Sequence, residues 1–117
     1  MKARRFFRSF RFAAEGIKTA LKHEQNIRFH ILAAVVVAAA GLVTGLSLLE
    51  WMVVIVLIGG MLALEMFNSA IERVVDLATS ELHPLAKQAK DMAAGAVLVF
   101  AVASAIIGLL IFLPKWF

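Results

Sequence analysis

Four polar side chains recur at helical spacing in a segment that is otherwise apolar enough to cross a membrane. They are Glu65, Asn68, Glu72 and Asp76. At 100° per residue they lie within about 80° of arc, so they form one stripe on one helix face. Carboxylates at membrane depth are costly and usually face a bundle interior, where they mark an ion or substrate site. A structural hydrogen bond between helices would explain a lone Asn, but three acids and an amide on one stripe favour a functional site.

The members of this stripe differ in their expected depth in the membrane. Counting about 20 residues inward from Trp51, at about 1.5 Å per residue, puts the inner edge of the hydrocarbon near Ala70. Glu65 is then about 8–10 Å inside that edge, where its carboxylate is suited to act as a general base on an alcohol. Glu72 and Asp76 lie in the aqueous interface, where Glu72 can bind a hard cation. The stripe therefore joins the aqueous phase to the bilayer.

Three more charged residues lie at the same interfacial level. Glu24 belongs to a polar stretch before the first apolar segment, and Lys90 and Asp91 stand at the start of the last one. Glu24 and Glu72 together could hold Mg²⁺, which favours one or two carboxylates along with phosphate oxygens and water. Lys90 could contact phosphates, or it could be an interfacial anchor whose stem follows the membrane surface. These residue types predict a phosphoryl-transfer site.

Several other kinds of site have no counterpart in the sequence. The chain has no cysteine, which excludes disulfides, iron–sulfur clusters, thiolate nucleophiles and Cys-based zinc sites. Its three histidines, His23, His30 and His83, do not have the spacing of a zinc site. The sequence contains no P-loop, protein-kinase signature, Gly-x-Ser-x-Gly elbow or His-Glu-x-x-His motif. Any nucleotide site is therefore not a P-loop.

Composition assigns these residues to an integral membrane protein. The 117 residues are 62% hydrophobic, and the mean hydropathy is +0.91. We expect one all-α membrane domain over residues 1–117, made of an amphipathic surface helix and three transmembrane helices. The expected bounds are 4–22 for the surface helix and 29–49, 51–77 and 84–113 for the three spans. Pro84 suits the first turn of the last helix, and Pro114 is expected to end it.

The first two of these segments carry further signals. Segment 4–22 is basic on one face and apolar on the other, so we expect it to lie on an anionic membrane surface. Phe12 projects from its polar face, where it either stacks on a base or is simply exposed. In the first span, Gly41 and Gly45 form a GxxxG motif, which favours close approach of another helix. An Ala-x-Ala match at 38–40 is not expected to be a signal-peptide cleavage site, because a long leader precedes it and two spans follow.

Lysine and arginine are unevenly distributed around the three spans. Eight precede the first span, none lies between the first and second, three lie between the second and third, and one follows the third. The positive-inside rule then puts the N-terminus and the region 73–91 in the cytoplasm and the C-terminus outside. We therefore expect a multi-pass protein of the cell membrane with all its candidate site residues on the cytoplasmic face.

One run of residues is specific enough to suggest a family. It reads Glu65-Met-Phe-Asn68-Ser-Ala-Ile-Glu72-Arg-Val-Val-Asp76 and is followed by His83-Pro84-Leu-Ala-Lys87-Gln-Ala-Lys90-Asp91. The chain closely resembles the small membrane kinases of the prokaryotic diacylglycerol kinase family, over almost its whole length. This resemblance implies a homotrimeric lipid kinase that uses ATP and Mg²⁺ and shares its active sites between neighbouring subunits.

The resemblance also implies roles for individual residues. Glu65 would be the catalytic base, and Glu24 and Glu72 would hold the metal on the ATP phosphates. The expected nucleotide-binding residues are Phe12, Glu24, Asn68, Glu72, Asp76, Glu81, His83, Lys90 and Asp91. The residues expected on the side of the lipid substrate are Arg5, Asn26, Arg28 and His30. Phe12 stands where the family often has a tyrosine near the adenine, so stacking is retained there and a hydrogen bond is not.

The family has two branches that differ in their lipid substrate, undecaprenol or diacylglycerol. The stretch Glu24-Gln-Asn26-Ile-Arg28-Phe-His30 is similar to the Glu-x-Asn-x-Arg-x-His of the undecaprenol branch. The segment 83–87 and Gly95 also resemble that branch. We therefore expect a kinase that converts undecaprenol to undecaprenyl phosphate, with a diacylglycerol kinase that makes phosphatidic acid as the alternative. ATP and a membrane lipid alcohol are the expected partners, and nucleic acid is not.

Two other functional classes fit the sequence less well than a lipid kinase. A small oligomeric transporter that exchanges protons for a cation would also place a Glu in the membrane. Such a protein usually has four spans, and it would leave Glu24, Lys90 and Asp91 without a role. A non-enzymatic membrane scaffold does not require an acidic stripe. Neither class consumes ATP, which separates both from a kinase.

Overall fold

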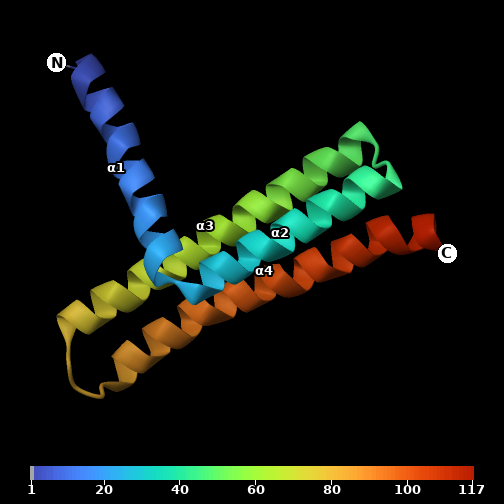
Figure 1. The fold of residues 1–117 in the computed structure, drawn as a ribbon. Helices are drawn as coiled ribbons and strands as arrows, with labels where there is room; N and C mark the ends of the chain where they lie inside the picture. Colours follow the sequence, from blue (N-terminus) through green and yellow to red (C-terminus); the bar gives the residue numbers. More distant parts are fainter. Residues whose placement is uncertain (1) are drawn as a thin grey trace.

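The computed structural model describes residues 2–117 and contains four helices in this range. They are α1 (Lys2–His23), α2 (Gln25–Thr44), α3 (Leu48–Ala78) and α4 (Pro84–Trp116). Helices α2, α3 and α4 run alongside one another as a bundle, and α1 projects from it at an angle (Figure 1). The three bundle helices are each long and apolar enough to cross a membrane. The prediction of four helices, three of them candidate spans, is confirmed.

The two ends of the bundle differ in what they carry. The α1–α2 junction and the α3–α4 loop lie at one end, which we call the site end, and the α2–α3 turn and the C-terminus lie at the other (Figure 1). Helix α3 has 31 residues and α2 has 20, so α3 is eleven residues longer. At about 1.5 Å per residue this surplus is roughly 16 Å. Since the turn holds the two helices level at the other end, α3 extends beyond α2 at the site end.

The turn between α2 and α3 differs from the sequence prediction. The first span was expected to end at 49 and the second to begin at 51, whereas α2 ends at Thr44 and α3 begins at Leu48. Gly45 has a φ of 79°, the left-handed conformation that favours glycine at a helix C-terminus. Ser47 and Glu50 form a capping box that starts α3. The predicted boundary between the first and second spans was therefore wrong. Hydropathy does not show the turn, because apolar residues flank it on both sides.

Three glycines serve two purposes in the bundle, a helix cap and close packing against aromatic rings. Gly45 is the C-cap of α2, so its assignment to a GxxxG helix interface was wrong. Gly41 does pack closely, because a Cβ atom there would lie 2.7 Å from the Trp51 ring. At Gly60 of α3, a Cβ atom would lie 2.5 Å from Cζ of Phe100 in α4. A missing side chain therefore allows the close approach of α3 and α4 at Gly60.

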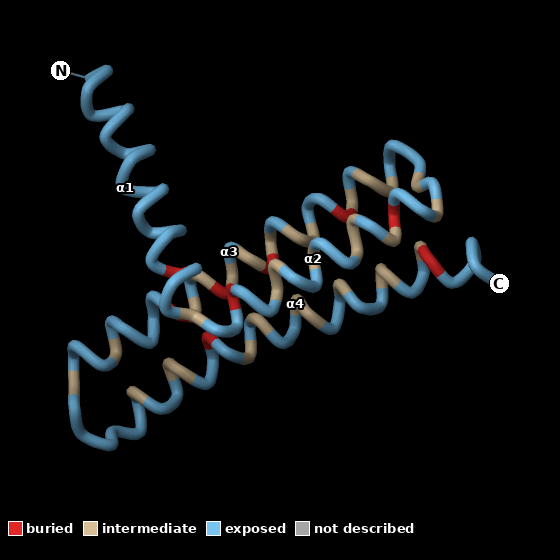
Figure 2. Tube along the Cα trace, in the orientation of Figure 1, coloured by how far each residue is buried: buried red, intermediate tan, exposed pale blue. Residues whose placement is uncertain are grey.

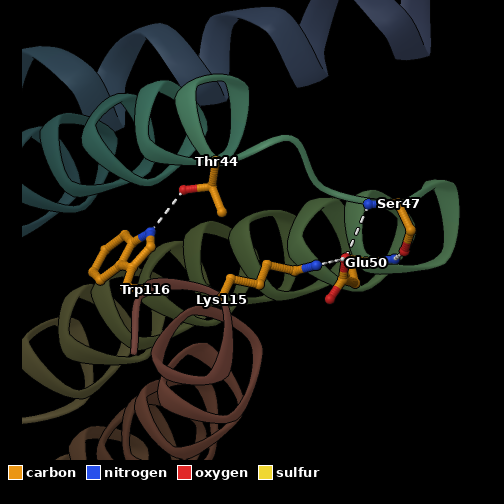
Figure 3. Close-up of polar contacts among 5 residues, drawn as sticks. All are labelled: Thr44, Ser47, Glu50, Lys115 and Trp116. Carbon is orange, nitrogen blue, oxygen red and sulfur yellow. Dashed lines mark hydrogen bonds and ion pairs between the residues drawn. The ribbon is translucent and has the colours of Figure 1, made fainter.

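The prediction that Pro114 ends the last helix was also wrong. A proline in a helix loses one backbone hydrogen bond, yet α4 continues to Trp116. Side chains of this last turn bind the neighbouring helices (Figure 3). The Trp116 Nε1 donates to Thr44 Oγ1 at 2.9 Å, and Lys115 Nζ lies 3.1 Å from Glu50 Oε1. These contacts with α2 and α3 account for the continued helix.

Few of residues 2–117 are buried, and those that are lie mainly on the inner faces of the bundle (Figure 2). In α1 only Ala20 is buried, so the apolar face of this helix is uncovered. In α3 the buried residues are Val54, Met61, Glu65 and Ser69. Their spacing of seven and four residues places them on one helix face. Two of these four side chains are polar, and they mark the start of the candidate site.

Candidate active site

Glu65, on α3, faces α2 and is almost completely buried. Its relative exposure is 4%. Its Oε1 atom lies 3.1 Å from Nε2 of His30, which is on α2. A buried carboxylate needs a hydrogen-bond donor or a charge partner, and here the imidazole supplies that contact. The contact joins the predicted base to one of the residues predicted on the lipid side.

Exposure increases along the polar stripe from Glu65 toward the end of α3. Asn68 is partly exposed as a residue, but its Oδ1 atom is buried and has no hydrogen-bond partner within residues 2–117. Glu72 and Asp76 are exposed. They lie beyond the level at which α2 begins, on the part of α3 that extends past it. Burial within the bundle therefore decreases from Glu65 through Asn68 to Glu72 and Asp76.

The α3–α4 loop encloses a second group of predicted residues. A cavity of about 870 Å³ lies at the end of α3, and its lining includes Asp76, Glu81, His83 and Lys90. Lys90 Nζ lies 2.7 Å from Asp76 Oδ1. His83 is the N-cap of α4, and its Nδ1 accepts a hydrogen bond from the backbone N–H of Leu85 at 3.1 Å. The fold thus brings four of the predicted nucleotide residues around one cavity.

Glu24 has a partner that the sequence analysis missed. Arg73 Nη1 lies 2.6 Å from Glu24 Oε1 and also donates to the backbone oxygen of Ser69 at 3.3 Å. In the sequence, Arg73 counted only toward the charge asymmetry of the membrane flanks. No spacing rule links positions 24 and 73, because their contact depends on how α2 and α3 are aligned. The only sequence signal that Arg73 belongs to the site was that it directly follows Glu72.

Glu24 and Glu72 are carboxylates, the type of ligand that Mg²⁺ prefers. Among residues 2–117, no group of three or more His, Cys, Asp or Glu side chains could hold a metal ion. A two-carboxylate site completed by phosphate oxygens does not need such a group. Glu24 is the N-cap of α2, but its side chain makes no capping hydrogen bond. Its carboxylate therefore points to a cation instead, in this structure the guanidinium of Arg73.

Two predicted residues lie on α1, away from these groups. Arg5 and Phe12 are both exposed on the helix that projects from the bundle. The Phe12 ring has the Arg11 guanidinium carbon 5.6 Å from its centroid, a cation–π contact within α1. The structure therefore does not bring Arg5 or Phe12 into the cavity lined by the α3–α4 loop.

Three other predicted residues lie near the site but make local contacts. Arg28 Nη1 donates to the backbone oxygens of Leu21 and Lys22, at 3.1 and 2.9 Å, and so satisfies carbonyls at the end of α1. Asn26 is exposed on the first turn of α2. Asp91 Oδ2 pairs with Lys87 Nζ at 2.6 Å, one helical turn away on α4. Arg28 thus fixes the α1–α2 junction beside Glu24.

Comparison with known proteins identifies the family. Residues 11–112 match the family described as prokaryotic diacylglycerol kinase. The chain belongs to this family. It is therefore a lipid kinase and a multi-pass membrane protein, which confirms the family, the enzyme class and the membrane location predicted from the sequence.

Individual relatives of the kinase carry two different names. The protein named undecaprenol kinase of Bacillus subtilis (strain 168) is 58% identical over 111 residues, which are 95% of this chain and 90% of the relative. A diacylglycerol kinase of Synechocystis sp. is 39% identical over 107 residues, 91% of this chain and 61% of the relative. A diacylglycerol kinase of Helicobacter pylori (strain J99) is 37% identical over 97 residues, 82% of this chain and 75% of the relative.

Proposed function

We propose that this kinase transfers the γ-phosphoryl group of ATP to undecaprenol and forms undecaprenyl phosphate. The observation that carries the choice of lipid is the 58% identity to a protein named undecaprenol kinase, against 39% and 37% to proteins named diacylglycerol kinase. The Glu24–His30 stretch supports the same branch, and its His30 contacts Glu65. Diacylglycerol is the alternative acceptor, because most of the named relatives carry that name.

Glu65 is the catalytic base in this proposal. Its carboxylate is buried where α3 packs against α2, out of bulk water. A base positioned within hydrogen-bond reach of a hydroxyl typically contributes about 10²–10⁴-fold to a reaction rate. As the lipid oxygen bonds to the γ-phosphorus, the bond from that phosphorus to the bridging oxygen of ADP breaks. The hydroxyl proton passes to the Glu65 carboxylate, and ADP leaves with the bridging oxygen.

The nucleotide binds at the site end of the bundle, toward the α3–α4 loop. Lys90, now paired with Asp76, binds the phosphates as a charge-assisted donor. Asp91, Asn68, Glu81 and His83 complete the surroundings of the nucleotide. Phe12 is proposed to stack on the adenine, although within this one chain it lies on α1, away from the cavity. Asn68 Oδ1 is buried and lacks a partner in residues 2–117, which leaves it available to a bound ligand.

Glu24 and Glu72 would hold Mg²⁺ on the ATP phosphates. When bound, the ion neutralises phosphate charge, which is the main requirement of phosphoryl transfer together with positioning. The exposure of Glu72 and the uncapped side chain of Glu24 support this assignment. Asn26, Arg28 and His30 are proposed on the lipid side, where Arg28 orders the α1–α2 junction. Arg5 is proposed there too, although within this one chain it lies on the projecting α1.

The enzyme works as a homotrimer with the site end and the N-terminus in the cytoplasm and the C-terminus outside. The excess of Lys and Arg at the site end supports this orientation. The uncovered faces of the bundle helices leave room for contacts between subunits, since only six apolar residues are buried within residues 2–117. In this arrangement ATP reaches the site from water and the lipid reaches it from the bilayer.

Replacement of Glu65 by Gln tests the catalytic assignment. We expect Glu65→Gln to lose about 10²–10⁴-fold in turnover and to retain ATP binding, because it removes the base and keeps the side-chain shape. ADP release with undecaprenol in mixed micelles measures turnover, and binding of a non-hydrolysable ATP analogue measures affinity. Loss of affinity with Glu65→Gln would put Glu65 in the nucleotide site instead and contradict its role as base.

A further inference from the structure

The contact between His30 and Glu65 indicates a role for His30 beyond binding on the lipid side. Within residues 2–117, His30 Nε2 is the one hydrogen-bond partner of the Glu65 carboxylate, at 3.1 Å from Oε1. The Glu65 side chain is 5% exposed and that of His30 is 23% exposed. The bond therefore joins a buried carboxylate on α3 to a mostly covered imidazole on α2.

We propose that His30 is a positioning residue for Glu65, holding its Oε1 atom so that Oε2 faces the hydroxyl of the lipid alcohol. The inference rests on the proposed function, in which Glu65 is the base. It adds a specific duty for His30, which acts through Glu65 and exchanges no proton with the substrate.

The surroundings of His30 support this assignment. His30 lies at the polar end of a groove of about 290 Å³ between α2, α3 and α4. Other lining residues are mostly apolar, including Ala34, Met61 and Gly108, and Ser104 is the one other polar residue in the lining. Within residues 2–117, neither the groove nor the rest of the chain supplies another hydrogen bond to the Glu65 carboxylate.

The groove also indicates the direction of approach of the substrate. A lipid alcohol has a long apolar chain and one hydroxyl, and the groove has long apolar walls with His30 at one end. The rings of Phe29 and His30 lie nearly perpendicular to each other, with centroids 6.0 Å apart and an interplanar angle of 84°.

A fixed carboxylate matters because a reacting group that is misplaced by about 1 Å can lose about 10²-fold in rate. A glutamate side chain has several rotatable bonds, and without a partner its oxygens would sample several orientations. The competing explanation is that His30 only satisfies a buried carboxylate and stabilises the bundle. Under that explanation His30 affects folding, but not the turnover of molecules that are folded.

Three variants distinguish the two explanations. His30→Met removes the donor and keeps an apolar side chain, while His30→Gln keeps an N–H at nearly the position of Nε2. Thr44→Val is the matched control, because it removes the hydrogen bond from Trp116 to α2 at the opposite end of the bundle. Steady-state kinetics with undecaprenol in mixed micelles give kcat and KM for both substrates, and thermal unfolding gives stability.

We expect His30→Met to lower kcat by about 10- to 100-fold, the range typical of residues that orient a functional group, with KM for ATP unchanged. We expect His30→Gln to restore most of this loss and Thr44→Val to keep the wild-type kcat despite its lost hydrogen bond. With His30 intact, the ¹⁵N resonance of its Nε2 should differ between the wild-type protein and Glu65→Gln, which reports the bond without any turnover.

Two outcomes would overturn the inference. One is a His30→Met enzyme with the wild-type kcat. The other is a His30→Gln enzyme that is as slow as His30→Met, together with an unshifted ¹⁵N resonance. If His30→Met does not fold, an unshifted ¹⁵N resonance of His30 in Glu65→Gln alone refutes the inference. Glu65→Gln separates this failure from that of the proposed function. If Glu65→Gln keeps full turnover, the base assignment itself is wrong, whereas an inactive Glu65→Gln beside a fully active His30→Met refutes only the role of His30.

Discussion

Replacement of Lys90 by Met should weaken ATP binding without affecting the lipid. Lys90 lies beside the α3–α4 cavity, with Nζ 2.7 Å from Asp76 Oδ1. A hydrogen bond from an ammonium to phosphate corresponds to roughly 10- to 100-fold in affinity. Because the Lys90 side chain is 41% exposed, solvent screens this contact. We therefore expect the lower end of that range, a rise in KM for ATP of about tenfold.

The bundle provides a matched control for this substitution. Lys115 is also on α4, is 32% exposed and pairs with a carboxylate of α3, Glu50, at the end of the bundle away from the site. Lys115→Met thus removes the same charge and a similar ion pair (Figure 3). ADP release at varied ATP and saturating undecaprenol gives KM for each variant. Equal KM values for Lys90→Met and Lys115→Met would refute a phosphate contact of Lys90.

Two further substitutions test packing and the carboxylate level of the site. Gly60→Ala should destabilise the protein by about 1–3 kcal/mol, because its Cβ atom would meet the Phe100 ring, whereas nothing lies within 4 Å of a Cβ atom at Gly59. Thermal unfolding compares Gly60→Ala with Gly59→Ala, and equal stability would contradict the close contact. Arg73→Gln should tighten Mn²⁺ binding up to about fivefold, because it removes the cation that now pairs with Glu24. Titration of the purified protein followed by the electron paramagnetic resonance of free Mn²⁺ measures this, and weaker binding would contradict a metal site at Glu24.

The residue types of the candidate site, and the helix face that they share, are readable from the sequence because they depend on helical spacing alone. Glu65, Asn68, Glu72 and Asp76 share a face in any regular helix, and their burial follows their order along α3. Hydropathy likewise identifies three apolar helices. It does not locate the α2–α3 turn at Gly45, because apolar residues flank the turn on both sides and the signal there is a backbone conformation.

Contacts between helices could not be predicted in the same way. The pairing of His30 with Glu65, and of Arg73 with Glu24, depends on the alignment of α2 with α3. That alignment follows from the length of the turn and from side-chain packing, neither of which has a simple sequence signal. The last turn of α4 was misjudged for a related reason. Proline disfavours a helix locally, but the contact of Trp116 with α2 outweighs that preference.

The most direct test of the central proposal is the lipid preference of the purified enzyme. ATP-dependent ADP release should be measured in mixed micelles with undecaprenol, with diacylglycerol and without lipid, using Glu65→Gln as the inactive control. The proposed function predicts faster turnover, as kcat/KM, with undecaprenol, and little ADP release from Glu65→Gln with either lipid. A higher kcat/KM with diacylglycerol would contradict the proposed substrate.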